Sequence, residues 1–419
     1  MERPRERALV VGAQVRGAQN AWTLEDSLQE RAALADTAGV LVVGQTTQYL
    51  DEINPATFIG KGKVQEIADL QAELGFGLVI FDDELLPRQI RNLEEALGVT
   101  VLDRTALILD VFAQHARTRE GALQVELAQY EYRLPRLTRR WTHLSRQAVG
   151  GVGLRGPGET QLEADRREIR RRIVHLQSEL EKVRAHRALY RNQRERQGLP
   201  VIAIVGYTNA GKSTLLNALT NAQVVAEDRL FATLDPTTRR LTLPGGTEAL
   251  ITDTVGFIQK LPPSIVAAFR ATLEEIGDAD VLVHVVDVTH PNAVQQAQTV
   301  DQIQRELEVG ERPTLVALNK NDHLPDPQGA VEAAARYPHG VAISAARGLG
   351  LEQLVSRLEL ALAEAMVRVT VRIPYRDSGL VAMFHRHGIV RSEGYDAAGT
   401  ELDGYIPRRL VPSFRPYLA

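Results

Sequence analysis

The chain has 419 residues, a formal net charge of −4 and no cysteine. This length predicts three or four domains, and the lack of cysteine excludes a disulfide scaffold and a cysteine metal site. Because no apolar run has membrane-spanning length and no signal-peptide pattern is present, we expect a cytoplasmic protein with no membrane span. We also expect it to be a monomer.

Residues 1–118 predict a small α/β domain. Apolar strands are expected at 8–11, 40–43, 78–81 and 100–102, with helices near 24–37, 64–74 and 88–97 between them. Strands alternating with helices favour a parallel sheet. The stretch Gly60-Lys61-Gly62-Lys63 precedes the second helix and could contact phosphate or RNA. It is not a complete phosphate motif, which favours the simpler interpretation of a flexible helix entry.

Residues 119–198 predict a basic antiparallel helical hairpin. Apolar residues alternate at spacings of four and three in two stretches, at Leu123, Leu127, Tyr130, Leu134, Leu137 and Trp141, and at Ile169, Ile173, Leu176, Leu180 and Val183. Seams of this period let two helices pack together. Gly150 to Gly158 would form the tip, and Pro135 is expected to kink the first helix.

The hairpin is rich in positive charge. Between Arg166 and Arg196 there are eleven Arg or Lys residues and four Glu residues. These cations could lie along RNA phosphates, or their long stems could cover apolar surface. The charge pattern alone does not separate the two interpretations.

Residues 199–366 predict a P-loop GTPase domain of the α/β class. Its first box lies between an apolar strand at 201–205 and a helix at 212–219, and consists of Gly206, Tyr207, Thr208, Asn209, Ala210, Gly211, Lys212 and Ser213, followed by Thr214. The glycines let backbone N–H groups surround phosphates at a helix start. Lys212 would bridge the β- and γ-phosphates, and Ser213 would bind Mg²⁺. Only six of the 49 basic residues are lysine, so lysine here indicates a chemical requirement.

Three further boxes follow, each directly after an expected strand: Asp253-Thr254-Val255-Gly256, Asn319-Lys320-Asn321-Asp322 and Ser344-Ala345-Ala346. Asp253 would hold Mg²⁺ through water, and the Gly256 N–H would contact the γ-phosphate. The Asp322 carboxylate can accept from both N1–H and N2–H of guanine, a donor pair that adenine lacks. Four boxes in this order would arise by chance less than about one time in a hundred, and they predict binding of GTP and GDP.

Residues 367–419 predict a small α+β domain. We expect a strand at 367–373, a helix near 379–387 and two strands joined by a turn at 396–399. The complete architecture is therefore a small parallel α/β domain, a helical hairpin, a P-loop GTPase domain and a small α+β domain.

Beyond the four boxes, the chain resembles the HflX GTPases over nearly its whole length. The resemblance includes a glycine-rich signature from Gly150 to Glu163 and a switch segment from Leu230 to Arg239, with Phe231, Ala232, Thr233, Leu234 and Asp235 expected at the nucleotide. It implies that Thr233 closes on Mg²⁺ when a γ-phosphate is present. We therefore expect Lys212, Thr233 and Gly256 to act in catalysis, and Ser213, Thr233 and Asp253 to hold the metal.

Intrinsic GTP hydrolysis is expected to be slow. Phe257 follows Gly256, at a position where many regulatory GTPases have a water-orienting glutamine, and a phenyl ring cannot hydrogen-bond to water. In related GTPases the asparagine equivalent to Asn209 coordinates K⁺. Asn209 could do the same, or it could simply favour the tight turn of the loop.

The resemblance also implies partners. HflX relatives bind the large ribosomal subunit and its ribosomal RNA, which favours a GTPase that splits ribosomal subunits or keeps them apart under stress. Two alternatives remain, an ATP-dependent RNA remodeller with GTP as its regulator and a GTPase of ribosome assembly.

Overall fold

The computed structural model describes residues 5–17, 22–137, 161–197, 199–220, 230–246, 248–262, 265, 276–306, 312–337 and 339–418. The chain forms two compact units. The first comprises Met1–Val183, Arg229–Phe231 and Lys260–Phe269, and the second comprises Arg184–Asp228, Ala232–Gln259 and Arg270–Ala419. Two short segments from within the GTPase sequence therefore belong to the first unit.

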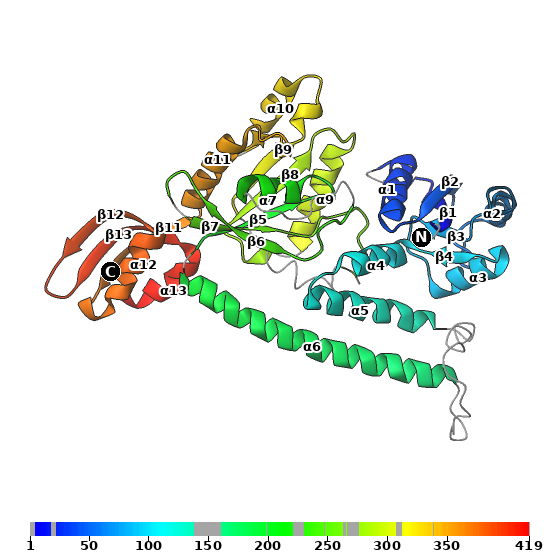
Figure 1. Cartoon of the computed structure of the whole chain (residues 1–419), viewed down its shortest axis with the longest axis horizontal. Coiled ribbons are helices and arrows are strands. Elements are labelled where there is room, and N and C mark those ends of the chain that lie inside the picture. Colours follow the sequence, from blue (N-terminus) through cyan, green and yellow to red (C-terminus); the bar gives the residue numbers. More distant parts are fainter. Residues whose placement is uncertain are drawn as a thin grey trace. The chain divides into compact units, whose positions relative to one another are not determined.

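The N-terminal sheet is parallel, as predicted. Its order is β2-β1-β3-β4, built from β1 (Arg7–Val15), β2 (Leu41–Leu50), β3 (Leu78–Phe81) and β4 (Thr100–Leu102) (Figure 1). The helices are α1 (Leu24–Thr37), α2 (Lys61–Leu74), α3 (Pro87–Leu97) and α4 (Arg104–His115). Apolar residues of α2 and α3 pack on one face of this sheet around Leu9 and Val11.

Helix α4 was not predicted from the sequence. Asp103 caps its start by accepting a hydrogen bond from the Ala106 N–H at 2.9 Å. Its apolar residues form an almost continuous run, and periodicity cannot distinguish such a run from a buried strand.

The hairpin pairs α5 (Arg119–Arg133) with α6 (Gln161–Gln197). Leu127, Leu176 and Leu180 form its buried centre, with Leu123, Tyr130 and Ile173 packed against it, which confirms the central part of the predicted seam. Pro135 does not kink a longer helix. It lies in the 3-10 turn Leu134–Arg136, which ends α5, because proline cannot supply the N–H that would continue the helical bonding. Trp141 and the expected tip at Gly150 to Gly158 lie outside the described residues.

The GTPase sheet has the order β10-β9-β8-β5-β7-β6 and is parallel except for β6. Its strands are β5 (Val201–Gly206), β6 (Thr237–Thr242), β7 (Glu248–Asp253), β8 (Val281–Asp287), β9 (Thr314–Asn319) and β10 (Val341–Ala342). The central strands are apolar and buried because helices cover both faces of the sheet (Figure 1).

Two pairs of helices cover these faces. Helices α7 (Lys212–Thr220) and α11 (Leu351–Glu364) contribute apolar residues to one core, while α9 (Ala293–Glu306) and α10 (Pro327–Ala334) pack on the other face. The carboxyl ends of β5, β7 and β9 lead into the first three predicted nucleotide boxes, and Ser344 follows β10 closely. All four boxes therefore begin near one edge of a single parallel sheet.

The C-terminal part is an antiparallel sheet of order β11-β13-β12, with β11 (Met366–Ile373), β12 (Ile389–Tyr395) and β13 (Thr400–Pro407). Helix α12 (Ser378–His387) is followed by the sheet's last two strands and by the short α13 (Val411–Phe414). Phe384 and Phe414 meet edge to face at 5.5 Å in its core. This confirms the predicted α+β fold, including the turn at 396–399. Within the described residues, no helix combines the length and apolar character that crossing a membrane requires.

Candidate nucleotide-binding site

The P-loop backbone requires glycine at two positions. Gly206 has φ 155° and Gly211 has φ 94°, values that side chains rarely allow. A Cβ at Gly206 would overlap the Val285 backbone oxygen, and one at Gly211 would overlap the Asn319 side-chain amide. Asn209 also has a positive φ, 61°, which asparagine tolerates better than most residues. The loop thus turns tightly between β5 and α7.

Lys212 is buried at the start of α7. Its Nζ donates to the Tyr207 carbonyl oxygen at 2.8 Å, and its exposed fraction is 6%. Burial lowers the pKa of Lys212 to about 8, while the nearby Asp253 carboxylate opposes this shift. An anionic phosphate beside this ammonium would favour its charged form.

Three oxygen-bearing side chains converge near the P-loop, and they are the predicted metal residues. Ser213 Oγ donates to Asp253 Oδ2 at 2.6 Å and lies 2.7 Å from Thr233 Oγ1. The other Asp253 oxygen, Oδ1, is buried and has no hydrogen-bond partner among the described residues. Burial raises the pKa of Asp253, and the charge of Lys212 partly offsets this rise. Hard oxygen donors with an unsatisfied carboxylate oxygen fit a Mg²⁺ ion.

The expected switch segment places its two apolar side chains inside the protein. Phe231 is 2% exposed and has φ 57°, and Leu234 is also 2% exposed. Any contact of these two residues with nucleotide would therefore come from the backbone. Ala232 and Asp235 are half-buried.

The backbone of the Asp253-to-Gly256 box lies against the P-loop. A Cβ at Gly256 would come within 2.8 Å of Thr208 Cα and 2.9 Å of Lys212 Nζ. The Phe257 N–H donates to the Gly206 oxygen at 3.1 Å, and the Phe257 oxygen accepts from the Thr208 N–H at 2.8 Å. The Phe257 side chain is 1% exposed and packs in the core. The position after the box glycine is thus a structural anchor in this protein.

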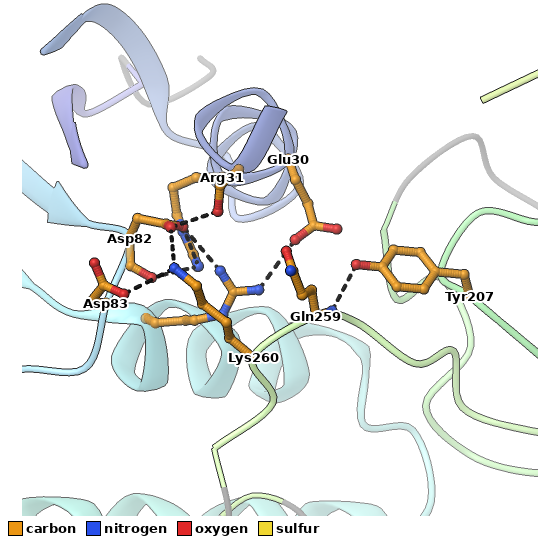
Figure 2. Close-up of polar contacts among 9 residues, drawn as sticks. Glu30, Arg31, Asp82, Asp83, Tyr207, Gln259 and Lys260 are labelled. Atoms are coloured by element: carbon orange, nitrogen blue, oxygen red, sulfur yellow. Dashed lines mark hydrogen bonds and ion pairs between the residues drawn. The ribbon is translucent and has the colours of Figure 1, made fainter. Parts of the chain in front are cut away.

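Tyr207 extends this contact with its side chain. Its hydroxyl accepts from the Gln259 N–H at 2.7 Å (Figure 2). Thr254 Oγ1 donates to the Ile204 oxygen at 2.7 Å, and both Thr254 and Val255 are buried. Sequence patterns could not reveal the Tyr207 hydroxyl contact, because Gln259 follows the recognised box.

Asn319 connects the third box with the first and the fourth. Its Nδ2 donates to the Ala210 oxygen at 2.8 Å, and its Oδ1 accepts from the Ala345 N–H at 3.0 Å. Lys320 adopts a left-handed conformation, with φ 65°, and its Nζ lies 2.7 Å from Asp287. The sequence analysis did not predict that Asp287 belongs to the site. Its position at the end of β8, paired with Asn319 of β9 in the sheet, is the signal that could have indicated it.

The proposed guanine-binding carboxylate is partly buried. The Asp322 side chain is 16% exposed, and the Ser344 hydroxyl lowers its pKa by hydrogen bonding to it. The neighbouring Asn321 is buried, and its Oδ1 has no hydrogen-bond partner in the described part of the chain. Ala346 is exposed at the end of the fourth box. The Asp322 carboxylate is thus held beside the fourth box by its hydrogen bond with Ser344.

Known protein families match the N-terminal domain, the helical hairpin and the GTPase domain. Profiles described as GTP-binding GTPase N-terminal, GTP-binding GTPase Middle Region and 50S ribosome-binding GTPase match residues 25–113, 115–194 and 201–320. GTPase HflX of Escherichia coli strain K12 is 44% identical over 376 residues, covering 90% of this chain and 88% of that protein. GTPase HflX of Caldanaerobacter subterraneus subsp. tengcongensis is 46% identical over 395 residues, covering 94% and 90%.

A solved structure is also similar to the chain. It is a GTP-binding protein of the archaeon Sulfolobus solfataricus in complex with GDP, with 26% identity, a TM-score of 0.45 and coverage of 86% of this chain and 99% of that one. The family assignment rests on the HflX proteins, which match nearly end to end at well above 30% identity. The four nucleotide boxes lie together at the edge of the GTPase sheet. The chain therefore belongs to the HflX family of P-loop GTPases and is a GTP-hydrolysing enzyme.

Proposed function

We propose that this GTPase is a switch whose GTP form binds the large ribosomal subunit and splits ribosomal subunits, or keeps them apart, under stress. The observation that carries the proposal is the match of residues 201–320 to a family described as 50S ribosome-binding GTPase. Ribosomal RNA would be its main partner, and such a role belongs in the cytoplasm. GTP hydrolysis would end the interaction and reset the protein.

Hydrolysis would use the residues that converge at the P-loop. Lys212, released from the Tyr207 oxygen, would pair with the β- and γ-phosphate oxygens, while P-loop N–H groups hold the phosphate chain. Ser213, Thr233 and Asp253 would hold Mg²⁺. When bound, Mg²⁺ neutralises charge that develops on the phosphate oxygens. The Gly256 N–H, which belongs to a backbone fastened to the P-loop, would donate to the γ-phosphate.

A monovalent cation beside Asn209 would supply positive charge for catalysis. Phe257 is buried and offers no polar group for orienting water, so another source of transition-state stabilisation is needed. We expect K⁺ to raise the GTPase rate about tenfold or more over Na⁺, and Asn209→Ala to remove that difference. Steady-state rates of GTP hydrolysis, measured for both proteins at equal concentrations of K⁺ or Na⁺, test this prediction. Equal rates in the two salts would show that Asn209 only shapes the loop.

The exposed face of α6 is the proposed RNA contact. Arg170 and Arg171 are exposed, whereas Arg172 is engaged with Glu126 at 2.7 Å. Exposed cations that no carboxylate of the described residues engages are the ones available to phosphate oxygens. The hairpin therefore combines an apolar seam that holds it together with a basic face directed to solvent.

Sedimentation of intact ribosomes tests the proposal. With a non-hydrolysable GTP analogue we expect the protein to release subunits, and the double variant Arg170→Glu/Arg171→Glu to release few, because charge reversal repels phosphates. Arg16→Glu, which reverses an exposed arginine paired with Asp51, is the control and should act like the parent. Absence of release by the parent, combined with ATP-dependent opening of RNA duplexes, would instead support the RNA remodeller.

A further inference from the structure

A buried carboxylate organises the first unit. Asp82 follows β3, has no exposed surface and accepts from Ser27 Oγ at 2.6 Å. Arg31 and Arg104 each donate to its Oδ1, at 3.0 Å from the nearest nitrogen. Figure 2 shows Arg31 directed at the Asp82 carboxylate. Both arginines are almost fully buried, which makes this cluster part of the folded core.

A lysine from the GTPase sequence completes the cluster. Lys260 Nζ lies 3.0 Å from Asp82 Oδ2 and 3.0 Å from Asp83 Oδ1 (Figure 2). Arg104 also pairs with Glu30 at 3.2 Å. The cluster therefore contains three carboxylates and three cations, namely Glu30, Asp82 and Asp83 with Arg31, Arg104 and Lys260. Lys260 thus balances the charge of the cluster, and its side chain remains 33% exposed. Such a half-accessible cation can leave at lower cost than either buried arginine.

Lys260 follows the Asp253-to-Gly256 box closely in the sequence. Gly256 precedes it by four residues, and the backbone between them is fastened at Phe257 to the P-loop and at Gln259 to the Tyr207 hydroxyl. Lys260 itself has φ 49°, a conformation that a non-glycine residue adopts only when its surroundings hold it there. The segment after the box is therefore held tightly from Gly256 to Lys260.

The switch segment from Leu230 to Arg239 also has an anchor in the first unit. Phe231 belongs to the first unit, and its ring meets Phe112 of α4 edge to face, with 4.8 Å between ring centroids. Two residues later, Thr233 Oγ1 lies 2.7 Å from Ser213 Oγ, at the proposed metal site. The same structure thus combines Phe231 anchored in the first unit with Thr233 closed on the P-loop serine.

We propose that Lys260 and Phe231 are positioning residues through which the first unit holds two segments in the closed, triphosphate-binding arrangement: the backbone from Gly256 to Lys260 and the switch segment from Leu230 to Arg239. By thermodynamic linkage, an anchor that favours closure strengthens binding of GTP, and GTP strengthens the anchor by the same factor. GDP lacks the γ-phosphate that the Gly256 N–H would contact and in whose presence Thr233 would close on Mg²⁺, so GDP binding gains little from closure. The inference concerns the protein alone and does not depend on the ribosomal proposal.

Lys260→Met tests the anchor in the full-length protein. Fluorescence titration should show binding of a non-hydrolysable GTP analogue with Mg²⁺ weakened about tenfold and GDP binding changed by less than about twofold. Lys260→Arg, which keeps the charge, should restore most of the analogue affinity. Lys63→Met is the matched control, because Lys63 is also an ion-paired lysine of the first unit but pairs with Glu66 of its own helix.

A second variant guards against a general effect on folding. Asp83→Asn removes the more exposed partner of Lys260 and leaves the pairs of Asp82 with its arginines in place. It should shift the ratio of analogue to GDP affinity in the same direction by a smaller factor. The proposal is overturned if Lys260→Met weakens both nucleotides equally, if it changes neither, or if the Lys63 control has the same effect.

Discussion

Asp322→Asn is expected to change the preferred nucleotide from GTP to xanthosine triphosphate. Xanthine keeps the N1–H of guanine but has a carbonyl oxygen in place of the 2-amino group. An asparagine amide can accept from N1–H and donate to that oxygen, whereas it cannot accept from both guanine donors at once. We expect GTP affinity to fall about 100-fold or more, because a site built for two hydrogen bonds leaves polar groups unpaired when they are lost.

The structure supplies a matched control for this exchange. Asp326 lies four residues later, is exposed and caps α10 by accepting from the Gln328 N–H at 3.0 Å. Asn caps helices as well as Asp, so Asp326→Asn should leave binding unchanged. Asp322→Ala should bind neither nucleotide well. Calorimetric titration with guanosine, xanthosine and adenosine triphosphates measures all three variants, and an unchanged order of affinities in Asp322→Asn would reject the assigned role.

Asp82→Asn is expected to destabilise the first unit strongly. Removing the negative charge would leave Arg31 and Arg104 buried without their partner, and breaking a buried ion pair costs about 3–5 kcal/mol. Arg31 Nη1 already lacks a hydrogen-bond partner among the described residues, so the cluster has little capacity to compensate. Thermal unfolding followed by circular dichroism should show an earlier transition, with Tm lower by about 2–4 °C for each kcal/mol.

An exposed pair in the same unit provides the comparison. Asp51 contacts Arg16 at 3.2 Å, and its side chain is 84% exposed, so Asp51→Asn should not change Tm measurably. If the Asp82 and Asp51 variants both have the same Tm as the parent, the buried cluster does not stabilise the fold.

Lowering the pH should reduce the contribution of the Asp82 carboxylate to stability. Burial alone would raise the pKa of Asp82, but the charges of Arg31, Arg104 and Lys260 outweigh it and hold the pKa well below its usual range. A carboxyl whose pKa is depressed on folding adds stability above its unfolded pKa of about 4 and loses it as pH falls toward the folded value. The Tm difference between the parent and Asp82→Asn should therefore be constant near neutral pH and shrink below about pH 4.

The sequence by itself was sufficient to predict which residues form the nucleotide site, and the structure brings the four predicted boxes to one edge of the GTPase sheet. A P-loop needs glycines at positions of unusual φ and a lysine with small neighbours, and guanine recognition needs a carboxylate after a buried strand. These demands are local, so residues such as Lys212 and Asp322 stand at recognisable spacings beside apolar strands. The same local logic predicted the parallel N-terminal sheet and the hairpin seam.

Only the tertiary structure revealed what holds this site in place. Asp287 beside Lys320, the Tyr207 hydroxyl on Gln259, and Lys260 on a carboxylate 178 residues away are contacts between segments distant in sequence. The role of Phe257 as a backbone anchor also became clear only from the structure. Local sequence patterns reflect what each segment needs for its own structure and chemistry. Contacts between residues far apart in the sequence depend instead on which charged groups and aromatic rings the fold brings together.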